Sequence, residues 1–270
     1  MSHPLFDLSG RVAVVSGAAS GMGKAMSLGF AESGADLVLL DINLEGAEDT
    51  AQAISKLGRK AIALKCDVSD AGQVRAAYSR TDSEFGRVDI AGNVAGEGHT
   101  GRPEEIELAV VEKVFKNLVI GRFAACQEAG RRMLAQKRGS IINLGSIGGV
   151  NSLGRGHTPY GMAMGAVIQM TRELSTEWSG RGVRVNCIVP AQVMNKGLEA
   201  RMQARPDLTT TFLGGIPMGR FGKPNDIKGL AIFLASDASS WVTGAVIPLD
   251  GGNLALNAGG SYPGGPRVYG

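Results

Sequence analysis

The fold of this chain is decided by Ser16-Gly17-Ala18-Ala19-Ser20-Gly21-Met22-Gly23. An apolar run, Arg11–Ser16, leads into this stretch and an amphipathic segment, Gly21–Ser33, continues from it, so a strand, a turn and a helix are predicted in succession. The glycines allow a sharp turn and a close approach of ligand to backbone, while the helix N-terminus points free N–H groups at an anion. The stretch therefore predicts a cradle for the pyrophosphate of a dinucleotide; a plain strand–helix turn is the alternative.

Apolar runs and amphipathic stretches alternate along the remaining chain. Further strands are predicted at Asp36–Leu40, Lys60–Lys65, Arg87–Asn93, Ser140–Leu144, Val183–Val189 and Ala245–Leu249. Further helices are predicted at Leu44–Leu57, Ala71–Phe85, Glu105–Gln136 with a break near Lys116, Tyr160–Ser179 and Lys223–Ala235. Strands that are apolar throughout are buried on both faces, and strict alternation requires right-handed crossovers. The predicted fold class is α/β: a single Rossmann-type doubly wound parallel sheet of about seven strands flanked by helices, with strand order 3-2-1-4-5-6-7 by analogy.

No linker or internal repeat divides the chain. Residues 1–252 are interpreted as one dinucleotide-binding and catalytic domain. A Gly- and Pro-rich tail at 253–270 is either disordered or packed against a neighbouring subunit. Within the domain, Gln192–Gly222 is longer than the alternation needs, and its position after the carboxyl end of a strand predicts a lid.

The composition disfavours several classes of partner. A net charge of +3 with no basic block argues against nucleic acid, and no apolar run approaches the roughly 20 residues that span a bilayer. Cys66, Cys126 and Cys187 are widely spaced and lack metal-ligand spacing, so we expect reduced thiols, no metal and a cytoplasmic protein. The N-terminus has neither the basic nor the apolar region of a signal peptide.

Asp41 directly follows the second predicted strand. A carboxylate at this position accepts hydrogen bonds from the adenosine ribose 2′-hydroxyl and repels a 2′-phosphate. No Lys or Arg flanks Asp41 or lies within the glycine stretch to attract such a phosphate. The predicted cofactor is therefore NAD rather than NADP.

The ends of the third and fourth strands complete the predicted cofactor site. After the third strand comes Cys66-Asp67-Val68, in which Asp67 either faces the adenine or caps the next helix together with Ser69 and Asp70. The fourth strand ends in Asn93-Val94-Ala95-Gly96, where small residues such as Ala95 and Gly96 let a cofactor lie close to the backbone. The side chain of Asn93 is also suited to holding neighbouring backbones together.

These motifs resemble those of the short-chain dehydrogenase/reductase family over roughly residues 8–253. The matching positions are the glycine stretch, Asp67, Asn93 to Gly96, Asn117, Ser146, Tyr160, Pro190 and Asp250-Gly251-Gly252. The resemblance implies a nicotinamide cofactor, with Ser20, Met22, Pro190 and Val193 among its contacts. It also implies a homotetramer in which the helices near Asn117–Gln136 and Tyr160–Ser179 pack across a dimer interface. In this family pattern Asn117 holds a water or a backbone bend, Ser146 polarises the substrate carbonyl and Tyr160 transfers the proton.

Met164 departs from the family pattern, which has Lys four residues after the Tyr. Positions four apart share one face of a helix, so residue 164 is expected beside Tyr160. Free tyrosine has a pKa of about 10, and Met fills the space of Lys but can neither stabilise the anion nor bond ribose hydroxyls. We therefore expect the chemistry to be weakened by two to three orders of magnitude, roughly 100- to 1000-fold.

Three explanations of Met164 remain open. The first is an engineered change from Lys to Met. The second is a natural enzyme with different proton handling, in which His157 or a water assists; His157 is otherwise a solvated loop residue. The third is a catalytically inactive NAD-binding member of the same family.

The substrate pocket is expected between Glu97–Pro103, the loop Gly148–Thr158 and the segment Gln192–Arg220. The candidate substrate-binding side chains are Glu97, Asn151, His157, Gln192 and Asn195. These polar groups, with only 5% aromatic residues, favour a sugar, polyol or small hydroxy-ketone over a large flat substrate. The sequence thus predicts an NAD-dependent oxidoreductase that interconverts a secondary alcohol and a ketone.

Overall fold

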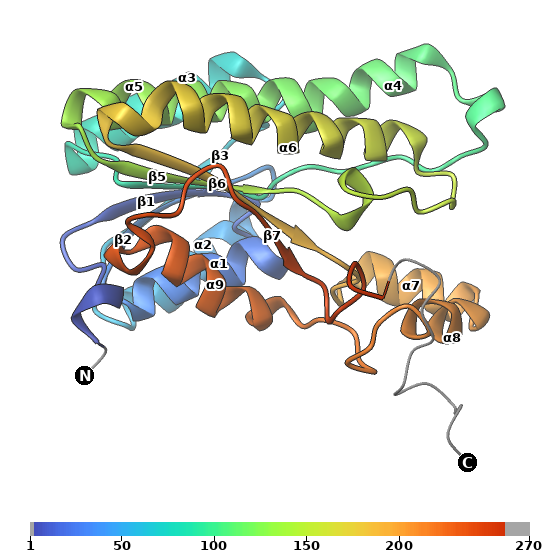
Figure 1. Ribbon diagram of the computed structural model, residues 1–270. Coiled ribbons are helices and arrows are strands. Elements are labelled where there is room, and N and C mark those ends of the chain that lie inside the picture. The colour runs from blue at the N-terminus through green and yellow to red at the C-terminus, as the bar shows by residue number, and fades with distance from the viewer. Residues whose placement is uncertain (1–2, 257–270) are drawn as a thin grey trace.

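A computed structural model describes residues 3–256 of the chain. Its centre is a seven-stranded sheet with the order β3-β2-β1-β4-β5-β6-β7, in which every neighbouring pair is parallel (Figure 1). The strands are β1 Val12–Ser16, β2 Asp36–Asp41, β3 Ala61–Lys65, β4 Ile90–Asn93, β5 Gly139–Leu144, β6 Val183–Pro190 and β7 Val246–Leu249. The predicted fold class and strand order are confirmed.

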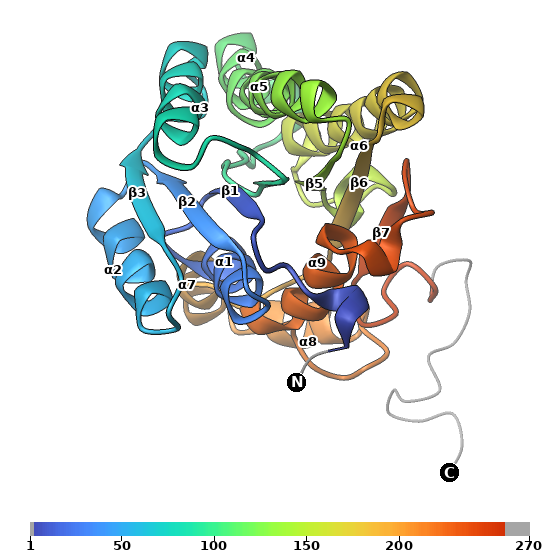
Figure 2. The same cartoon turned by 90° about the vertical axis from the view of Figure 1, so that its left-hand side faces the viewer.

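Helices cover both faces of the sheet, as Figure 2 shows. One face carries α1 Gly21–Glu32, α2 Leu44–Ser55 and α9 Ile227–Ala235. The other carries α3 Ala71–Phe85, α4 Leu108–Phe115, α5 Gly121–Gln136 and α6 Thr158–Trp178. Across residues 3–256, no helix combines the length and apolarity of a transmembrane segment.

The central strands bury both of their faces. In β1, Val12 and Val14 pack in the apolar layer that contains residues of α3 and α5, whereas Ala13 and Val15 pack in the layer that contains residues of α1 and α9. Alternation of side chains between the faces of a strand produces these two layers from one continuous apolar run. The three-layer arrangement fixes the carboxyl ends of the strands along one edge, where the loops gather.

Two predicted segments differ from the structure. The helix predicted to break near Lys116 is continuous, because α4 passes through a π-helical turn, Lys116–Ile120, into α5. The segment 192–222, predicted to be a lid, contains two short helices that the sequence did not predict, α7 Lys196–Ala204 and α8 Asp207–Leu213. The tail prediction falls mainly on residues 257–270, outside the described residues.

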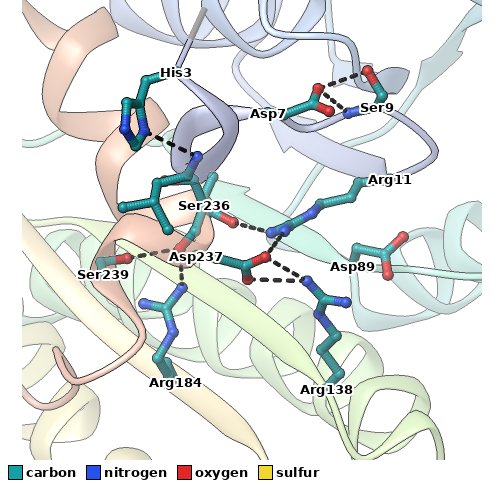
Figure 3. A network of polar contacts seen from close by, with 12 residues as sticks. His3, Asp7, Ser9, Arg11, Asp89, Arg138, Arg184, Ser236, Asp237 and Ser239 are labelled. Carbon is teal, nitrogen blue, oxygen red and sulfur yellow. Dashed lines mark hydrogen bonds and ion pairs between the residues drawn. The ribbon is translucent and has the colours of Figure 1, made fainter.

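A polar network joins the amino ends of the strands (Figure 3). Asp237 accepts hydrogen bonds from Arg11 at 2.7 Å and Arg138 at 2.9 Å, which precede β1 and β5. Beside them, Arg184 of β6 donates to the carbonyl oxygens of Leu234 at 2.8 Å and Ser236 at 3.1 Å. The network ties the turn after α9 to three strands at the edge opposite the carboxyl ends.

Candidate active site

The glycine stretch forms a tight turn between β1 and α1. A Cβ at Gly23 would lie 2.0 Å from the carbonyl oxygen of Gly17, so the helix packs directly on the turn. Gly21 has φ +55°, and a Cβ there would meet nothing within 4 Å. The side chain of Ser20, the N-cap of α1, makes no capping bond. The first N–H groups of α1 are therefore open to an anion, as a dinucleotide pyrophosphate requires.

Asp41 joins the end of β2 to this turn. One carboxylate oxygen accepts from the backbone N–H of Ala19 at 3.0 Å and the other from that of Asn43 at 2.9 Å. Each carboxylate oxygen has more than one lone pair, so the group retains capacity for a further donor. The carboxylate thus stands beside the glycine stretch with its negative charge on the edge of the candidate cofactor site.

The side chains that follow β3 are engaged in contacts within the chain. Asp67 accepts from the backbone N–H of Ser69 at 2.8 Å and from its hydroxyl at 2.7 Å. The N-cap of α3 is Asp70, which accepts from Gly72 N–H at 2.8 Å. Cys66 is buried in the apolar core, and burial raises the pKa of its thiol to about 11. The Cys66 side chain, which the sequence assigned to the cofactor site, is thus a core thiol.

The end of β4 combines a structural side chain with a backbone that lies close to the glycine stretch. Asn93 donates to Asn143 Oδ1 at 2.9 Å and to Cys126 Sγ at 3.2 Å, so its side chain holds β4, β5 and α5 together. A Cβ at Gly17 would lie 3.1 Å from the backbone nitrogen of Ala95. The glycine stretch and the turn after β4 are therefore adjacent walls of one site.

Asn117 lies within the π-helical turn and fixes the loop that follows β4. Its Oδ1 accepts from the backbone N–H of Glu97 at 3.0 Å. A Cβ at Gly96 would come within 2.9 Å of the same oxygen. Asn117 therefore ties the loop after β4 to the π-helical turn, while the side chain of Glu97 is exposed.

Ser146 and Tyr160 stand at the carboxyl edge of the sheet. Ser146 is nearly buried, and its Oγ accepts from Gly148 N–H at 3.1 Å, which leaves its own O–H available to donate. The Tyr160 ring lies against Gly98, where a Cβ would be 2.4 Å from Tyr160 Cδ2. The His157 ring is 6.2 Å from the Tyr160 ring, centroid to centroid.

Met164 is 2% exposed and belongs to an apolar cluster. Its neighbours in this cluster include Leu118 and Val189, and Tyr160 packs against the same cluster. The thioether thus fills space beneath the tyrosine without supplying a charge.

The loop between β5 and α6 forms most of the wall of a cavity of about 500 Å³, which Gly161, the residue after Tyr160, also lines. Asn151 and His157 line it. His157 is not a solvated loop residue: its Nδ1 is buried without a hydrogen-bond partner. Burial, followed by the charges of Arg201 and Arg155, lowers the pKa of His157. The imidazole is therefore neutral at pH 7 and able to bond a hydroxyl.

The remaining substrate candidates are not in the wall of this cavity. Gln192 has a buried Oε1 without a partner in the segment that follows β6. Asn195 caps α7, since its Oδ1 accepts from Leu198 N–H at 2.9 Å and its Nδ2 donates to the carbonyl oxygen of Val193 at 3.0 Å. Pro190 and Val193 are buried at and after the end of β6.

The sequence predictions missed Arg122, the second residue of α5. It is buried, and its Nη2 donates to the carbonyl oxygen of Ala95 at 2.9 Å. Helical spacing was the available signal, because Arg122 lies four residues from both Leu118 and Cys126 on the apolar stripe of the helix.

Comparisons with known proteins agree with this geometry. The family model described as Enoyl-(Acyl carrier protein) reductase matches residues 17–253. The chain is 38% identical to D-threitol dehydrogenase of Mycolicibacterium smegmatis over 92% of this chain and 94% of that protein. Its structure resembles a putative short-chain alcohol dehydrogenase from Sinorhizobium meliloti, with 36% identity, a TM-score of 0.88, and coverage of 93% of this chain and 99% of the other.

A third similar protein is a putative NAD(P)-dependent gluconate 5-dehydrogenase from Beutenbergia cavernae, solved with bound NADP at low occupancy. The identity is 34% and the TM-score 0.88, over 93% of this chain and 99% of that structure. The relatives are dehydrogenases, and the matches cover nearly the whole chain. The chain therefore belongs to the short-chain dehydrogenase/reductase family of oxidoreductases.

Proposed function

We propose that this protein is an NAD-dependent oxidoreductase that interconverts a secondary alcohol and a ketone on a sugar, polyol or small hydroxy-ketone. The observation that carries the proposal is that Ser146 and Tyr160 flank the loop that lines a cavity of about 500 Å³, at the same sheet edge as the glycine stretch. In open α/β sheets, ligands bind outside the carboxyl ends of the strands.

The preference for NAD rests on Asp41. Its carboxylate is held at the glycine stretch by Ala19 and Asn43, so it presents a fixed negative charge where the adenosine ribose would lie. Such a charge accepts bonds from a 2′-hydroxyl and repels a 2′-phosphate. The relative solved with NADP shows that this structural group includes NADP binders, so equal or better efficiency with NADP would refute the preference.

The chemistry follows from the positions of two hydroxyls. Bound nicotinamide accepts or donates the hydride at C4. In the oxidative direction Ser146 donates a hydrogen bond to the substrate oxygen, because its own Oγ already accepts from Gly148. Tyr160 takes the proton of the alcohol while the C–H bond releases its hydride, and both transfers reverse in reduction. Asn117 holds the loop that runs past Tyr160.

The substrate class rests on the lining of the cavity. Asn151 offers an amide, and the unpartnered Nδ1 of His157 offers one further hydrogen-bonding atom. A buried polar atom without a partner favours a ligand that supplies one. Similarity to a threitol dehydrogenase and a putative gluconate dehydrogenase supports a polyhydroxylated substrate.

Met164 favours one competing function, an inactive member of the family that binds NAD. The apolar cluster around Met164 contributes no cation to Tyr160. Unless another residue supplies that charge, turnover would be weakened strongly. Retention of dinucleotide binding without any turnover would identify this second function.

A homotetramer assembled as a dimer of dimers is part of the proposal. Ile120 is 56% exposed and Met162 is 51% exposed on the two long helical segments of one face. Exposed apolar side chains on one surface are typical of a covered interface. Sedimentation analysis would reveal a tetramer if these helices pack between subunits.

The direct test is NAD-linked turnover on a panel of polyols, sugars and simple ketones, with the Tyr160→Phe variant as the control. We expect oxidation of at least one polyol by the chain and loss of at least 99% of it in the variant. Absence of turnover across the panel, or equal turnover by both proteins, would contradict the proposal. Titration with NADH separates loss of binding from loss of chemistry.

A further inference from the structure

The cavity lined by the loop between β5 and α6 has a cationic side chain in its wall. Its polar lining side chains are those of Asn151, Ser152, Arg155, His157 and Thr158. Within residues 3–256, neither an aspartate nor a glutamate lines it. Arginine stays charged in proteins, so a ligand in this cavity meets a positive wall. A neutral polyol would leave that charge without a counter-ion.

Arg155 has no counter-ion in the described part of the chain. None of the ion pairs formed by residues 3–256 includes it, whereas Arg102, beside the same cavity, pairs with Glu105 at 3.3 Å. Arg155 is exposed, so a ligand can reach it from solvent. Its guanidinium carbon lies 4.5 Å from the centroid of the Phe212 ring. A cation–π contact occupies no hydrogen-bond donor, so the guanidinium N–H groups stay available to a ligand.

The backbone around Arg155 is tied to the loop that follows β4. Gly154 and Gly156 have φ of +59° and +69°, a region that L side chains rarely adopt. The carbonyl oxygen of Gly156 accepts from Gly101 N–H at 2.9 Å. A Cβ at Gly156 would lie 2.7 Å from the carbonyl oxygen of Gly101, so the two loops are in close contact. With the Phe212 ring on its side chain, Arg155 loses little freedom when it binds a ligand.

His157 adds a neutral hydrogen-bonding group to the same wall. Its Nδ1 is buried without a partner. Burial, followed by the charges of Arg201 and Arg155, lowers the pKa of His157. The neutral imidazole bonds a hydroxyl and does not balance an anion. Arg155 is therefore the single cation that the lining side chains contribute, which matches a ligand with one negative charge.

We propose that the substrate is a polyhydroxylated carboxylic acid and that Arg155 binds its carboxylate. The inference rests on the proposed function, because the same cavity must hold the alcohol that reacts. The planar guanidinium presents paired N–H groups that match the two oxygens of a carboxylate. The unpartnered Nδ1 of His157 and the amide of Asn151 bond hydroxyls of the same molecule.

The cavity also reaches the residues that carry the chemistry. Gly148, whose N–H donates to Ser146 Oγ at 3.1 Å, is part of its wall. Gly161, which directly follows Tyr160, is another part. A volume of about 500 Å³ accommodates a chain of several carbons. One molecule can therefore place an alcohol near the two hydroxyls while its carboxylate binds Arg155.

The test compares ligands that differ only in the charge on one end carbon. Each alditol is paired with the aldonate of the same stereochemistry: D-glucitol with D-gluconate, galactitol with D-galactonate, and D-mannitol with D-mannonate. Calorimetry is carried out on the protein saturated with NADH, because NADH and an alcohol are both reduced and do not react. We expect at least one aldonate to bind about tenfold more tightly than its alditol.

Two variants separate the charge of Arg155 from the position of its loop. Arg155→Met and Phe212→Leu both remove the contact between the guanidinium and the ring, so both should weaken alditol binding alike. Only Arg155→Met should also lower the ratio of aldonate to alditol affinity, by about tenfold. Arg155→Lys keeps the charge and should retain a preference for the aldonate. Arg201 does not line the cavity, so Arg201→Met should keep the ratio within about threefold.

The outcomes distinguish this inference from the proposed function. Equal or tighter binding of the alditols would overturn the inference, and NAD-linked oxidation of those alditols would leave the proposed function intact. An aldonate preference that survives in Arg155→Met, or that falls equally in Arg201→Met, would also overturn it, as would absence of binding by every pair. Tighter binding of D-glucitol 6-phosphate than of D-gluconate would assign the cavity to a phosphate group instead. An aldonate preference lost only in Arg155→Met, without turnover of any ligand, would support the carboxylate site and reject the proposed function.

Discussion

At the scale of single residues, alanine variants of Gly21 and Gly58 can be compared directly, because the two glycines have similar backbone conformations. Both have positive φ, +55° and +75°, and a Cβ at either would meet nothing within 4 Å. Alanine at such a φ costs about 1 kcal/mol of folding free energy. We expect Gly21→Ala and Gly58→Ala to lose similar stability, because both strain only the backbone.

Only Gly21→Ala should also weaken NADH binding, by at least about tenfold, because its methyl group projects into the anion cradle. Thermal unfolding and fluorescence titration with NADH measure the two effects. Equal NADH affinity of the two variants would argue against a dinucleotide at the glycine stretch.

Asp41 decides the choice between NAD and NADP by its charge. Asp41→Asn keeps an acceptor oxygen for Ala19 N–H but removes the repulsion of a 2′-phosphate. The ratio of kcat/KM with NAD to that with NADP should fall by roughly tenfold, a change of about 1.4 kcal/mol. Asp67→Asn, whose side chain is occupied by Ser69, serves as the control and should leave the ratio unchanged.

At the scale of elements, α8 is linked to the cavity wall. The Arg155 guanidinium lies 4.5 Å from the centroid of the Phe212 ring, so the loop between β5 and α6 is held against α8. A cation over an aromatic face contributes about 0.5–2 kcal/mol. We expect Phe212→Leu to raise KM for the alcohol roughly threefold to tenfold, through a looser loop.

The same substitution should leave the affinity for NADH unchanged, since neither residue approaches the glycine stretch. An Arg155→Met variant, which keeps an apolar stem on the ring, should reproduce the KM effect. Unaltered KM in both variants would show that α8 does not restrain the cavity.

The sequence predicted the long elements well and the local exceptions poorly. Continuous apolar runs such as Leu37 to Leu40 are typical of buried strands between helices, which is why the sheet was predictable, whereas the strand order was predicted only by analogy. A π-helical turn adds one residue to a helix without changing its composition, so the apparent break near Lys116 could not be interpreted. Helices α7 and α8 span only 9 and 7 residues, too short for a clear period.

The candidate site was predictable where backbone geometry demands a residue type. Gly23 must lack a side chain, and Asp41 follows its strand, so both could be identified. Hydrogen bonds between side chains were harder to predict from the sequence. Asn93 bonds Asn143, fifty residues away, and Asn195 caps the helix that follows it. Arg122 was missed because a charged residue on a helix is normally expected to face solvent.

At the scale of the whole molecule, the network around Asp237 fastens the edge opposite the site. Asp237→Asn should lower the free energy of unfolding by about 1 kcal/mol, because its loss leaves Arg11, whose side chain is 13% exposed, with only a carbonyl partner. High salt should reduce the part of this loss of stability that comes from the exposed ion pair between Arg138 and Asp237.

Urea unfolding measures this change, and NADH affinity is the internal control, since the network is far from the glycine stretch. A loss of NADH affinity as large as the loss of stability would show that the two edges are coupled. Arg102→Gln breaks an exposed pair with Glu105 and should have almost no effect on stability.

The central claim is that Tyr160 transfers the alcohol proton in an NAD-linked oxidoreductase, weakened by Met164. Its most direct test is NAD-linked turnover of polyols by four proteins: the chain, Tyr160→Phe, Met164→Lys and the double variant. We predict weak oxidation by the chain, a gain of roughly 100-fold in Met164→Lys, and loss of nearly all turnover in both proteins that carry Tyr160→Phe. Turnover that is retained in Tyr160→Phe, or that is absent from all four proteins, would contradict the claim.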